Sequence, residues 1–331
     1  MKTLKTLLVF VLVSILFISF IGFAMAVDLQ KVTIQIEGSA VPYYIPLFMG
    51  IELGYFESEG LEVDYLFGGA SDIVKNVAVG NVEFGFPNGE PVILALSQDI
   101  PVKVIHTTYQ HGLGSTLFLK ESGIKSPVDL KGKKVAITSY GSPNYPQLQV
   151  LLKKSGLSLE DINLEIVGTE AIIPALVNKR VDAICFSMLR TFELKSQGIE
   201  VDEFKSDEFL PSFGNVLITS EKLLKDNFDL AVKFSRALSR VMLYLSNPEN
   251  MKDATSKTIA KYTPTYAGRE DYMASVLTQV FANYLWVSED TKAFGFGYGN
   301  LDKWQETANL LKEYGIIEKE VKAIDFVIPR I

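Results

Sequence analysis

The sequence predicts an α/β protein of two lobes that are connected twice, with a mostly helical C-terminal part. Three observations support this fold class. Segments that alternate apolar and polar residues, as strands do, are followed by segments with helical spacing, and this order repeats. The order restarts near Ser115, and beyond Thr219 nearly every segment has helical spacing. The 331 residues provide for about two domains with full cores.

The first lobe begins with three strand–helix repeats and a fourth strand. Gly54 and Gly80 end two of the helices, because glycine readily adopts the left-handed conformation that closes a helix. Ser71 can cap the second helix. This order favours a mainly parallel sheet flanked by helices. The expected strands are Lys31–Ile36, Leu61–Leu66, Val82–Phe86 and Val102–Thr107, and the expected helices are Ile45–Glu52, Asp72–Val79 and Pro91–Gln98.

A second series of strands and helices follows, and a set of helices completes the chain. The expected strands of this series are Thr116–Lys120, Lys134–Thr138, Leu164–Val167 and Val181–Phe186, with Phe213–Thr219 extended. The expected helices are the short turn Pro127–Leu130, then Gln147–Ser155, Glu170–Asn178 and Leu189–Ser196. The C-terminal helices are Ser220–Asp226, Leu230–Ser246, Pro248–Thr263, Glu270–Tyr284 and Leu301–Tyr314.

Two extended segments, near Ser115–Phe118 and Gly214–Ile218, are the expected crossings between the lobes. Lobe 1 then comprises residues 28–115 plus 216–331, and lobe 2 comprises residues 116–215. Two lobes joined by two strands form a hinge with a cleft, and clefts between domains are favoured ligand sites.

Residues 1–26 are predicted to form a secretory signal peptide or an N-terminal anchor. Two lysines precede an apolar run from Leu7 to Val27, and the small residues Ala24 and Ala26 fit a cleavage site. The run is also long enough for a membrane-spanning helix, which needs about 20 residues. With either outcome the charge bias places the rest of the chain outside the cytoplasm, in the periplasm or at the extracellular face.

Composition excludes several classes of protein and site. The formal net charge of −7 offers no basic surface for nucleic acid. One cysteine, Cys185, excludes an internal disulfide and a cysteine-built metal site. Two histidines, His106 and His111, are too few for a histidine-rich metal site. We therefore expect no metal, no cofactor and a monomer.

Five stretches occur in an informative order along the chain. They are Pro46–Phe56 with Glu59–Val63, Gly69–Gly85, Gly123–Val135, Ile173–Ile184 and Trp304–Ile316. Together they resemble the periplasmic solute-binding proteins of ABC importers, most of all the group that binds nitrate, sulfonates, taurine and thiamine-pyrimidine precursors. The resemblance covers about Lys31 to Ile328. The lipobox cysteine that many bacterial relatives carry is missing.

The resemblance implies a type II periplasmic binding protein fold whose two lobes close over a small molecule. It also implies an ABC permease with its ATPase as partners, so the chain meets the membrane surface through the permease or through an uncleaved N-terminal helix. The resemblance leaves two other classes open. One is a binding domain that serves a sensor. The other is an enzyme that makes the thiamine pyrimidine, but that activity depends in relatives on a cysteine-rich stretch, which one cysteine cannot supply.

Candidate ligand residues of lobe 1 follow its strands, because loops at the carboxyl ends of parallel strands face the cleft. Aromatic rings in these loops can stack on a planar ligand. Alternatively, the rings of Tyr43 and Tyr44 pack under the first helix and have a purely structural role. A carboxylate or an amide can accept a hydrogen bond from a ligand amine, and the alternative for the carboxylate is stabilising a helix N-terminus. The candidates are Tyr43, Tyr44, Asn88, Glu90 and Tyr109.

Candidates of lobe 2 follow the strands Lys134–Thr138 and Val181–Phe186. Free N–H groups at a helix start suit an anionic oxygen, although Ser142 also fits an ordinary N-cap ahead of Pro143. In pyrimidine-binding relatives the matching segment holds a functional acid near the position of Glu193, so the resemblance implies a ligand role for Glu193. Cys185 is expected to be a buried apolar residue. The candidates are Tyr140, Ser142, Tyr145, Ser187, Arg190 and Glu193.

The candidate residues favour a planar nitrogen heterocycle, such as a thiamine pyrimidine precursor. Aromatic side chains are many among them, and Arg190 is the single arginine. The acids Glu90 and Glu193 suit ring amines, whereas Arg190 could equally pair with Glu193 three residues later. A bare anion such as nitrate or a sulfonate, which is the alternative ligand, is better served by arginines.

Overall fold

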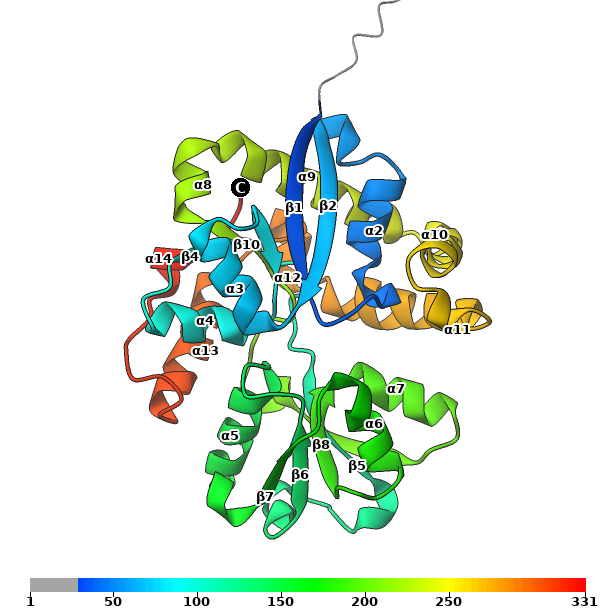
Figure 1. Ribbon diagram of the computed structural model, residues 1–331, viewed down its shortest axis with the longest axis vertical. Coiled ribbons are helices and arrows are strands. Elements are labelled where there is room, and N and C mark those ends of the chain that lie inside the picture. The colour runs from blue at the N-terminus through cyan, green and yellow to red at the C-terminus, as the bar shows by residue number, and fades with distance from the viewer. Residues whose placement is uncertain (1–28) are drawn as a thin grey trace, which may run out of the picture.

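The computed structural model describes residues 29–331 as two bodies, one above the other, each built around a five-stranded sheet (Figure 1). The prediction for residues 1–26 lies outside the described residues. From residue 29 onward, the structure contains no helix that is both long and apolar enough to span a membrane.

The upper sheet has the strand order β2-β1-β3-β10-β4. Four of these strands are mutually parallel, and β10 is antiparallel to both of its neighbours because it enters the sheet as the chain returns from the lower lobe. The strands are β1 (Gln30–Glu37), β2 (Leu61–Gly68), β3 (Phe84–Phe86), β4 (Val102–His106) and β10 (Leu217–Ser220).

The lower sheet repeats this arrangement with the order β7-β6-β8-β5-β9. Here β5, the first strand after the chain leaves the upper lobe, is the antiparallel one. The strands are β5 (Gly114–Leu119), β6 (Lys134–Ile137), β7 (Asn163–Ile166), β8 (Ala183–Ser187) and β9 (Val201–Lys205). The strands of the two sheets support the proposed division of the chain into lobe 1, residues 28–115 plus 216–331, and lobe 2, residues 116–215. Gly114 and Ser115, at the boundary, already belong to β5 of the lower sheet.

Helices flank both sheets, and the C-terminal set surrounds the upper one (Figure 1). In the upper lobe they are α2 (Ile45–Glu52), α3 (Ala70–Val79), α4 (Gly89–Ser97), α8 (Glu221–Asp226), α9 (Phe228–Leu245), α10 (Pro248–Lys261), α11 (Glu270–Val276), α12 (Glu289–Phe294), α13 (Leu301–Glu313) and α14 (Ala323–Phe326). A π-helical segment, Leu277–Leu285, continues α11. The lower lobe contains α5 (Asn144–Lys154), α6 (Thr169–Val177) and α7 (Leu189–Ser196).

The predicted fold class is confirmed, and the differences from the predicted elements are local. Helix α2 has the predicted bounds. The prediction that Ser71 caps α3 is wrong, because Gly69 is the N-cap and Ser71 lies inside the helix. Strand β9 was not predicted: Val201 is its one buried residue and the other positions are polar or partly exposed, as is common in a strand at a sheet edge.

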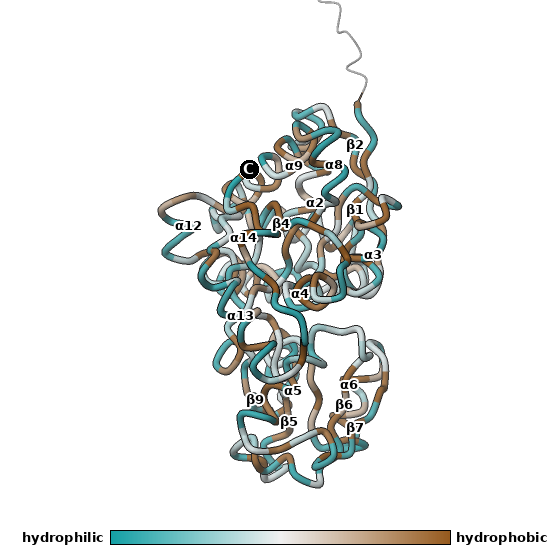
Figure 2. Tube along the Cα trace, turned by 90° about the vertical axis from the view of Figure 1, so that its left-hand side faces the viewer, coloured by the Kyte–Doolittle hydropathy of each residue, from teal (hydrophilic) through white to brown (hydrophobic). Residues whose placement is uncertain are grey.

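Apolar cores lie on both faces of the upper sheet, and one of them continues into the lower lobe. Trp304 of α13 is fully buried and packs against Phe213, which precedes β10, with ring centroids 4.7 Å apart. The same cluster includes Val104 of the upper sheet and Phe118 of the lower sheet. The two bodies remain distinct in the view turned by 90° (Figure 2).

Candidate functional site

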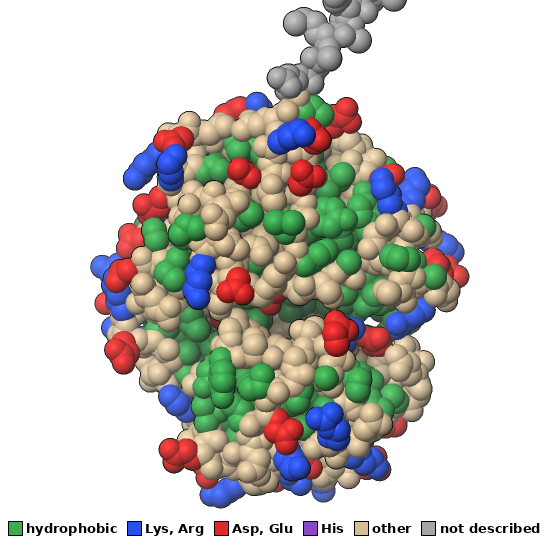
Figure 3. All heavy atoms as spheres, in the orientation of Figure 1, with side chains coloured by type: hydrophobic (Ala, Val, Ile, Leu, Met, Phe, Trp, Pro, Cys, Tyr) green, Lys and Arg blue, Asp and Glu red, His purple; other side chains and the backbone are tan. Residues whose placement is uncertain are grey.

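A cavity of about 500 Å³ lies between the two lobes, where the molecule is hollowed across its face (Figure 3). Its lining comes from the loops that follow β1, β3, β6, β7 and β8 and from the segments beside the crossings. Both sheets thus present strand ends and helix starts to the same space, which is the usual position of ligand sites in α/β folds.

Aromatic side chains form the upper wall of the cavity. Tyr43 and Phe281 stack with ring centroids 5.2 Å apart and planes within 15°. Tyr109 meets Phe281 edge to face at 5.6 Å, and its hydroxyl donates to the backbone oxygen of Tyr43 at 2.8 Å. Burial raises the pKa of the Tyr43 and Tyr109 phenols well above the ordinary value. The wall is therefore neutral and held in place by its own packing.

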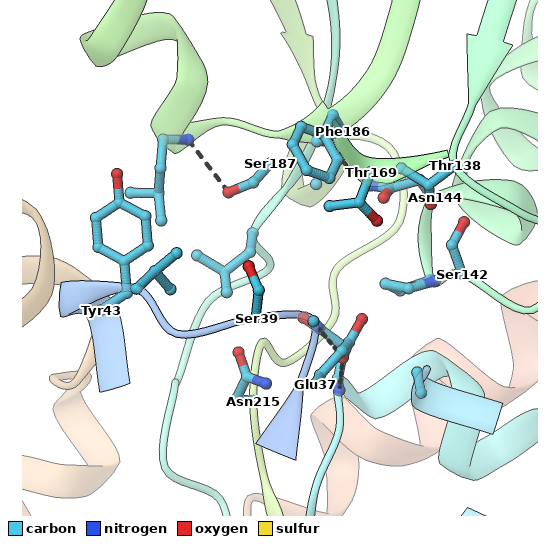
Figure 4. Close-up of a pocket in the computed structure, with 18 of the residues that line it drawn as sticks. Glu37, Ser39, Tyr43, Thr138, Ser142, Asn144, Thr169, Phe186, Ser187 and Asn215 are labelled. Carbon is cyan, nitrogen blue, oxygen red and sulfur yellow. Dashed lines mark hydrogen bonds between the residues drawn. The ribbon is translucent and has the colours of Figure 1, made fainter. Parts of the chain in front are cut away.

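A carboxylate, Glu37, forms the floor beside this wall (Figure 4). It is the last residue of β1, and its Oε2 accepts hydrogen bonds from Asn88 through the backbone N–H at 2.9 Å and the side-chain Nδ2 at 2.8 Å. Burial raises the pKa of Glu37, and the bonds from Asn88 oppose this. The effect of burial is larger than that of the hydrogen bonds, so the charge of the carboxylate is only partly compensated. A further hydrogen-bond donor would stabilise it.

Short polar side chains of the lower lobe cover the opposite side (Figure 4). Thr138, Ser139 and Ser142 follow β6, Thr169 begins α6, and Ser187 ends β8. The prediction that Ser142 caps the following helix is wrong. Helix α5 begins at Asn144, and the Ser142 hydroxyl instead donates to the Ser139 carbonyl at 2.9 Å.

An ion-pair cluster joins the lobes at one rim of the cavity. The Arg190 guanidinium lies over the ring of Phe186 at 5.3 Å and donates to Glu193 at 2.5 Å. The other carboxylate oxygen of Glu193 pairs with Arg269 of the upper lobe at 3.3 Å. Burial opposes the charge of Arg190, but the neighbouring Glu193 carboxylate helps to hold the pKa of the guanidinium above its ordinary value. Glu193 therefore bridges the two lobes.

A buried hydrogen bond joins the lobes beneath the cavity. Gln147 of α5 donates through Nε2 to Oε1 of Glu90 on α4 at 2.7 Å, and Asn144 donates to Oε1 of Gln147 at 3.1 Å. Glu90 is fully buried, and its Oε2 has no partner among the described residues. Burial raises the pKa of Glu90 to about 7.

Seven of the eleven predicted ligand residues line the cavity: Tyr43, Tyr44, Asn88, Tyr109, Ser142, Ser187 and Arg190. The structure places the other four outside the lining. Gln147 stands between Glu90 and the cavity, and Glu193 is turned to its two arginines. Tyr140 is largely exposed and meets Tyr145 edge to face at 5.1 Å.

Sequence reasoning missed part of the lining, including Glu37, Thr138, Thr169, Phe186, Asn215 and Phe281. The first four lie at the ends of strands or helix starts, and the rule that such positions face the cleft would have found them. Asn215 and Phe281 carry no local signal. Cys185 is buried, as predicted for an apolar residue. Burial raises the pKa of its thiol to about 12, so the side chain is uncharged.

A family described as NMT1/THI5 like matches residues 41–251 of the chain. The chain belongs to this family. The riboflavin-binding protein RibY of Chloroflexus aurantiacus is 26% identical over 88% of this chain and 83% of its own length. The formylaminopyrimidine-binding protein of Halalkalibacterium halodurans is 27% identical over 98% of both chains.

Two further comparisons complete the assignment of the fold and family. A fungal relative, from Aspergillus parasiticus, is named 4-amino-5-hydroxymethyl-2-methylpyrimidine phosphate synthase and is 28% identical over 65% of this chain and 67% of its own. The alkanesulfonate-binding protein SsuA from Xanthomonas axonopodis superposes with a TM-score of 0.67 at 16% identity, covering 91% of this chain and 99% of SsuA. The predicted family is confirmed, and the chain has the fold of the periplasmic binding proteins.

Proposed function

We propose that the chain is the extracytoplasmic solute-binding component of an ABC importer. It captures a planar nitrogen heterocycle in the cavity between the lobes and presents it to a permease and its ATPase. The observation that carries this proposal is the aromatic wall of Tyr43, Tyr109 and Phe281 beside the Glu37 carboxylate. The protein acts as a monomer that binds and releases without chemistry.

Two features of the cavity support a heteroaromatic ligand. Its volume of about 500 Å³ falls within the range of roughly 300–1,000 Å³ that is usual for small-molecule sites. Tyr43 of the upper lobe and Phe186 of the lower lobe both line it, so a flat ring can be held between faces from both lobes. The two binding proteins compared above are named for riboflavin and for a pyrimidine, and both of these are nitrogen heterocycles.

The charges beside the cavity argue against a bare anion, which is the alternative ligand of the same fold. Arg190 is the cation that lines the cavity in the described residues, and its charge is already paired with Glu193. Glu37 would repel an anion from the floor. A nitrate or sulfonate site needs cationic donors that remain free to bind the ligand.

Catalysis is not part of the proposal, although the fungal relative named above is called a synthase. The lone thiol, Cys185, is buried, and its raised pKa keeps it protonated. Only a thiolate is an effective nucleophile. The cavity instead offers the means for lobe closure: a ligand that contacts both walls favours the closed arrangement by its difference in affinity for the two states.

A thermal-shift screen followed by calorimetry tests the proposed ligand class. The panel contains riboflavin, aminopyrimidines, taurine, an alkanesulfonate and nitrate. Ring ligands should raise the melting temperature, since a ligand at a hundredfold excess over its Kd adds about 2.7 kcal/mol of stability. Tyr43→Ala should weaken ring binding about 5–150-fold, because one stacking partner is worth about 1–3 kcal/mol.

Tyr140→Ala is the matched control, because this tyrosine belongs to the lower lobe and lies outside the cavity lining. It should bind as the unmodified protein does. Stabilisation by nitrate or the sulfonates alone would overturn the heterocycle proposal while leaving the binding role in place.

A further inference from the structure

The floor of the cavity is built where three neighbouring strands of the upper sheet meet. Glu37 ends β1, Asn88 follows β3, and Asn215 precedes β10. Because β10 is antiparallel to β3, its start lies at the same sheet edge as the ends of β1 and β3. Figure 4, which has the lower lobe at the top, shows Glu37 and Asn215 side by side on the upper-lobe side of the cavity. They face the polar residues of the lower lobe.

The hydrogen bonds within the floor engage its donors. The Asn88 amide nitrogen donates to Oε2 of Glu37, and the Asn215 amide nitrogen donates to the Phe86 carbonyl at 2.8 Å. A carboxylate and a carbonyl can only accept, so the nitrogen of each amide must be the atom that faces them. The amide oxygens of Asn88 and Asn215 and the Oε1 atom of Glu37 have no hydrogen-bond partner in residues 29–331.

The charge of Glu37 is not matched by the protein. Glu37 takes part in no ion pair within the described part of the chain. Arg190, across the cavity, is paired with Glu193. Burial without a cation raises the pKa of Glu37. Glu37 is partly buried and lines the cavity, so a ligand that displaces water there can supply the donor that its Oε1 lacks within the described residues.

We propose that Glu37, oriented by Asn88, is the selectivity residue of the cleft and admits rings whose edge presents N–H donors. This inference rests on the proposed function and narrows its ligand class to amino-substituted or imide-bearing heterocycles. Such an edge meets the free Oε1 of Glu37 and the amide oxygens beside it. Rings of equal shape that carry a methyl group or an acceptor at that edge are rejected, as are anions.

The substitution Glu37→Gln inverts the polarity of one atom and leaves the shape unchanged. The Asn88 donors still require an oxygen opposite them, so the introduced amide turns its oxygen to Asn88 and its NH₂ group to the cavity. An acceptor for the ligand thereby becomes a donor. Glu37→Ala removes the acceptor without adding a donor, and it serves as the second variant.

The test uses two pairs of probes that differ by an N–H donor, of which the first pair is isosteric, and isothermal titration calorimetry on the purified protein. The pairs are 4-amino-2-methylpyrimidine against 2,4-dimethylpyrimidine, and riboflavin against riboflavin methylated at N3. The unmodified protein should prefer the N–H member of at least one pair by about 10–100-fold, the usual range for a hydrogen bond to a charged group. Both variants should reduce that preference below about threefold. Glu37→Gln should in addition weaken the N–H ligand at least as much as Glu37→Ala does.

Glu121→Gln is the matched control, because Glu121 is an exposed carboxylate of the lower lobe that lies outside the cavity lining. It should keep the preference, and thermal unfolding should show all variants folded. Equal binding of both members of each pair by the unmodified protein, or a preference that survives both Glu37 variants, overturns this inference and leaves the ring-binding function intact. Failure of every ring to bind, with or without binding of taurine or nitrate, overturns both proposals.

Discussion

The two walls of the cavity differ in how they are held. The upper wall consists of buried rings that stack on one another, with the Tyr109 hydroxyl bonded to the backbone of Tyr43. The lower wall consists mainly of short hydroxyl side chains on loops, of which Ser139 and Thr169 are exposed. One wall is part of a hydrophobic core, and the other is part of a surface.

This difference indicates a division of roles between the lobes. The upper rings lose little conformational freedom when a ligand binds, because packing has already selected their rotamers. The lower hydroxyls can donate or accept, so they adjust to whatever polar groups the ligand presents. We infer that the upper wall selects the ring and that the lower wall completes the contacts when the lobes meet. Three predictions test this difference.

The largest effect is expected from truncating one aromatic residue in each wall. Phe281→Ala should lower the free energy of unfolding by roughly 3–5 kcal/mol, because Phe281 is fully buried and its removal leaves a cavity. Phe186→Ala should cost only about 1 kcal/mol, because Phe186 is half-buried. Urea denaturation measures both, and equal losses would contradict the proposed difference between the walls.

The buried hydrogen bond between Gln147 of the lower lobe and Glu90 of the upper lobe should make the stability of the protein depend on pH. The pKa of Glu90 is about 7 in the folded protein, against an ordinary value of 4.5. A carboxyl whose pKa is raised by folding stabilises fully below pH 4.5, and this contribution is lost as the pH rises through 7. Glu90→Gln keeps the bond from Gln147 without a charge, so it should remove this loss and be more stable than the unmodified protein by roughly 3 kcal/mol at pH 8.

Thermal or urea unfolding between pH 4 and 8 measures this dependence. Glu170→Gln is the control, because an exposed carboxyl of the lower wall should leave the pH profile unchanged. A Glu90→Gln variant with the pH profile of the unmodified protein would show that Glu90 ionises normally and that the inter-lobe bond does not depend on its protonation.

The smallest effect is expected at the rim. Glu193→Gln weakens the bridge to both Arg190 and Arg269, and it should lower ligand affinity by about fivefold or less, because partly exposed ion pairs are worth about 1 kcal/mol. Small-angle scattering with ligand present should then show a more open average shape. Glu121→Gln, which removes an ion pair with Lys179 inside the lower lobe, should change neither quantity.

Much of the fold could be predicted from the sequence, because strand and helix periodicities are local. Helix α2 was predicted to the residue, whereas the charged edge strand β9 has no apolar alternation to reveal it. The site was predicted less completely. Tyr43 and Tyr109 follow strands and were found, but Glu37 ends a strand in a position where a solvent-facing charge is equally plausible.

The sequence by itself determined the alternation of strands and helices, which depends on patterns of neighbouring residues. It also determined the family, which depends on the order of such stretches along the chain. Only the tertiary structure decided which side chains face the cavity. Gln147 comes between Glu90 and the ligand space, and Phe281 reaches the upper wall from a helix near the end of the chain. The reason is physical: a cavity is formed by loops distant in sequence, and the burial that shifts a carboxyl pKa depends on every segment packed around it.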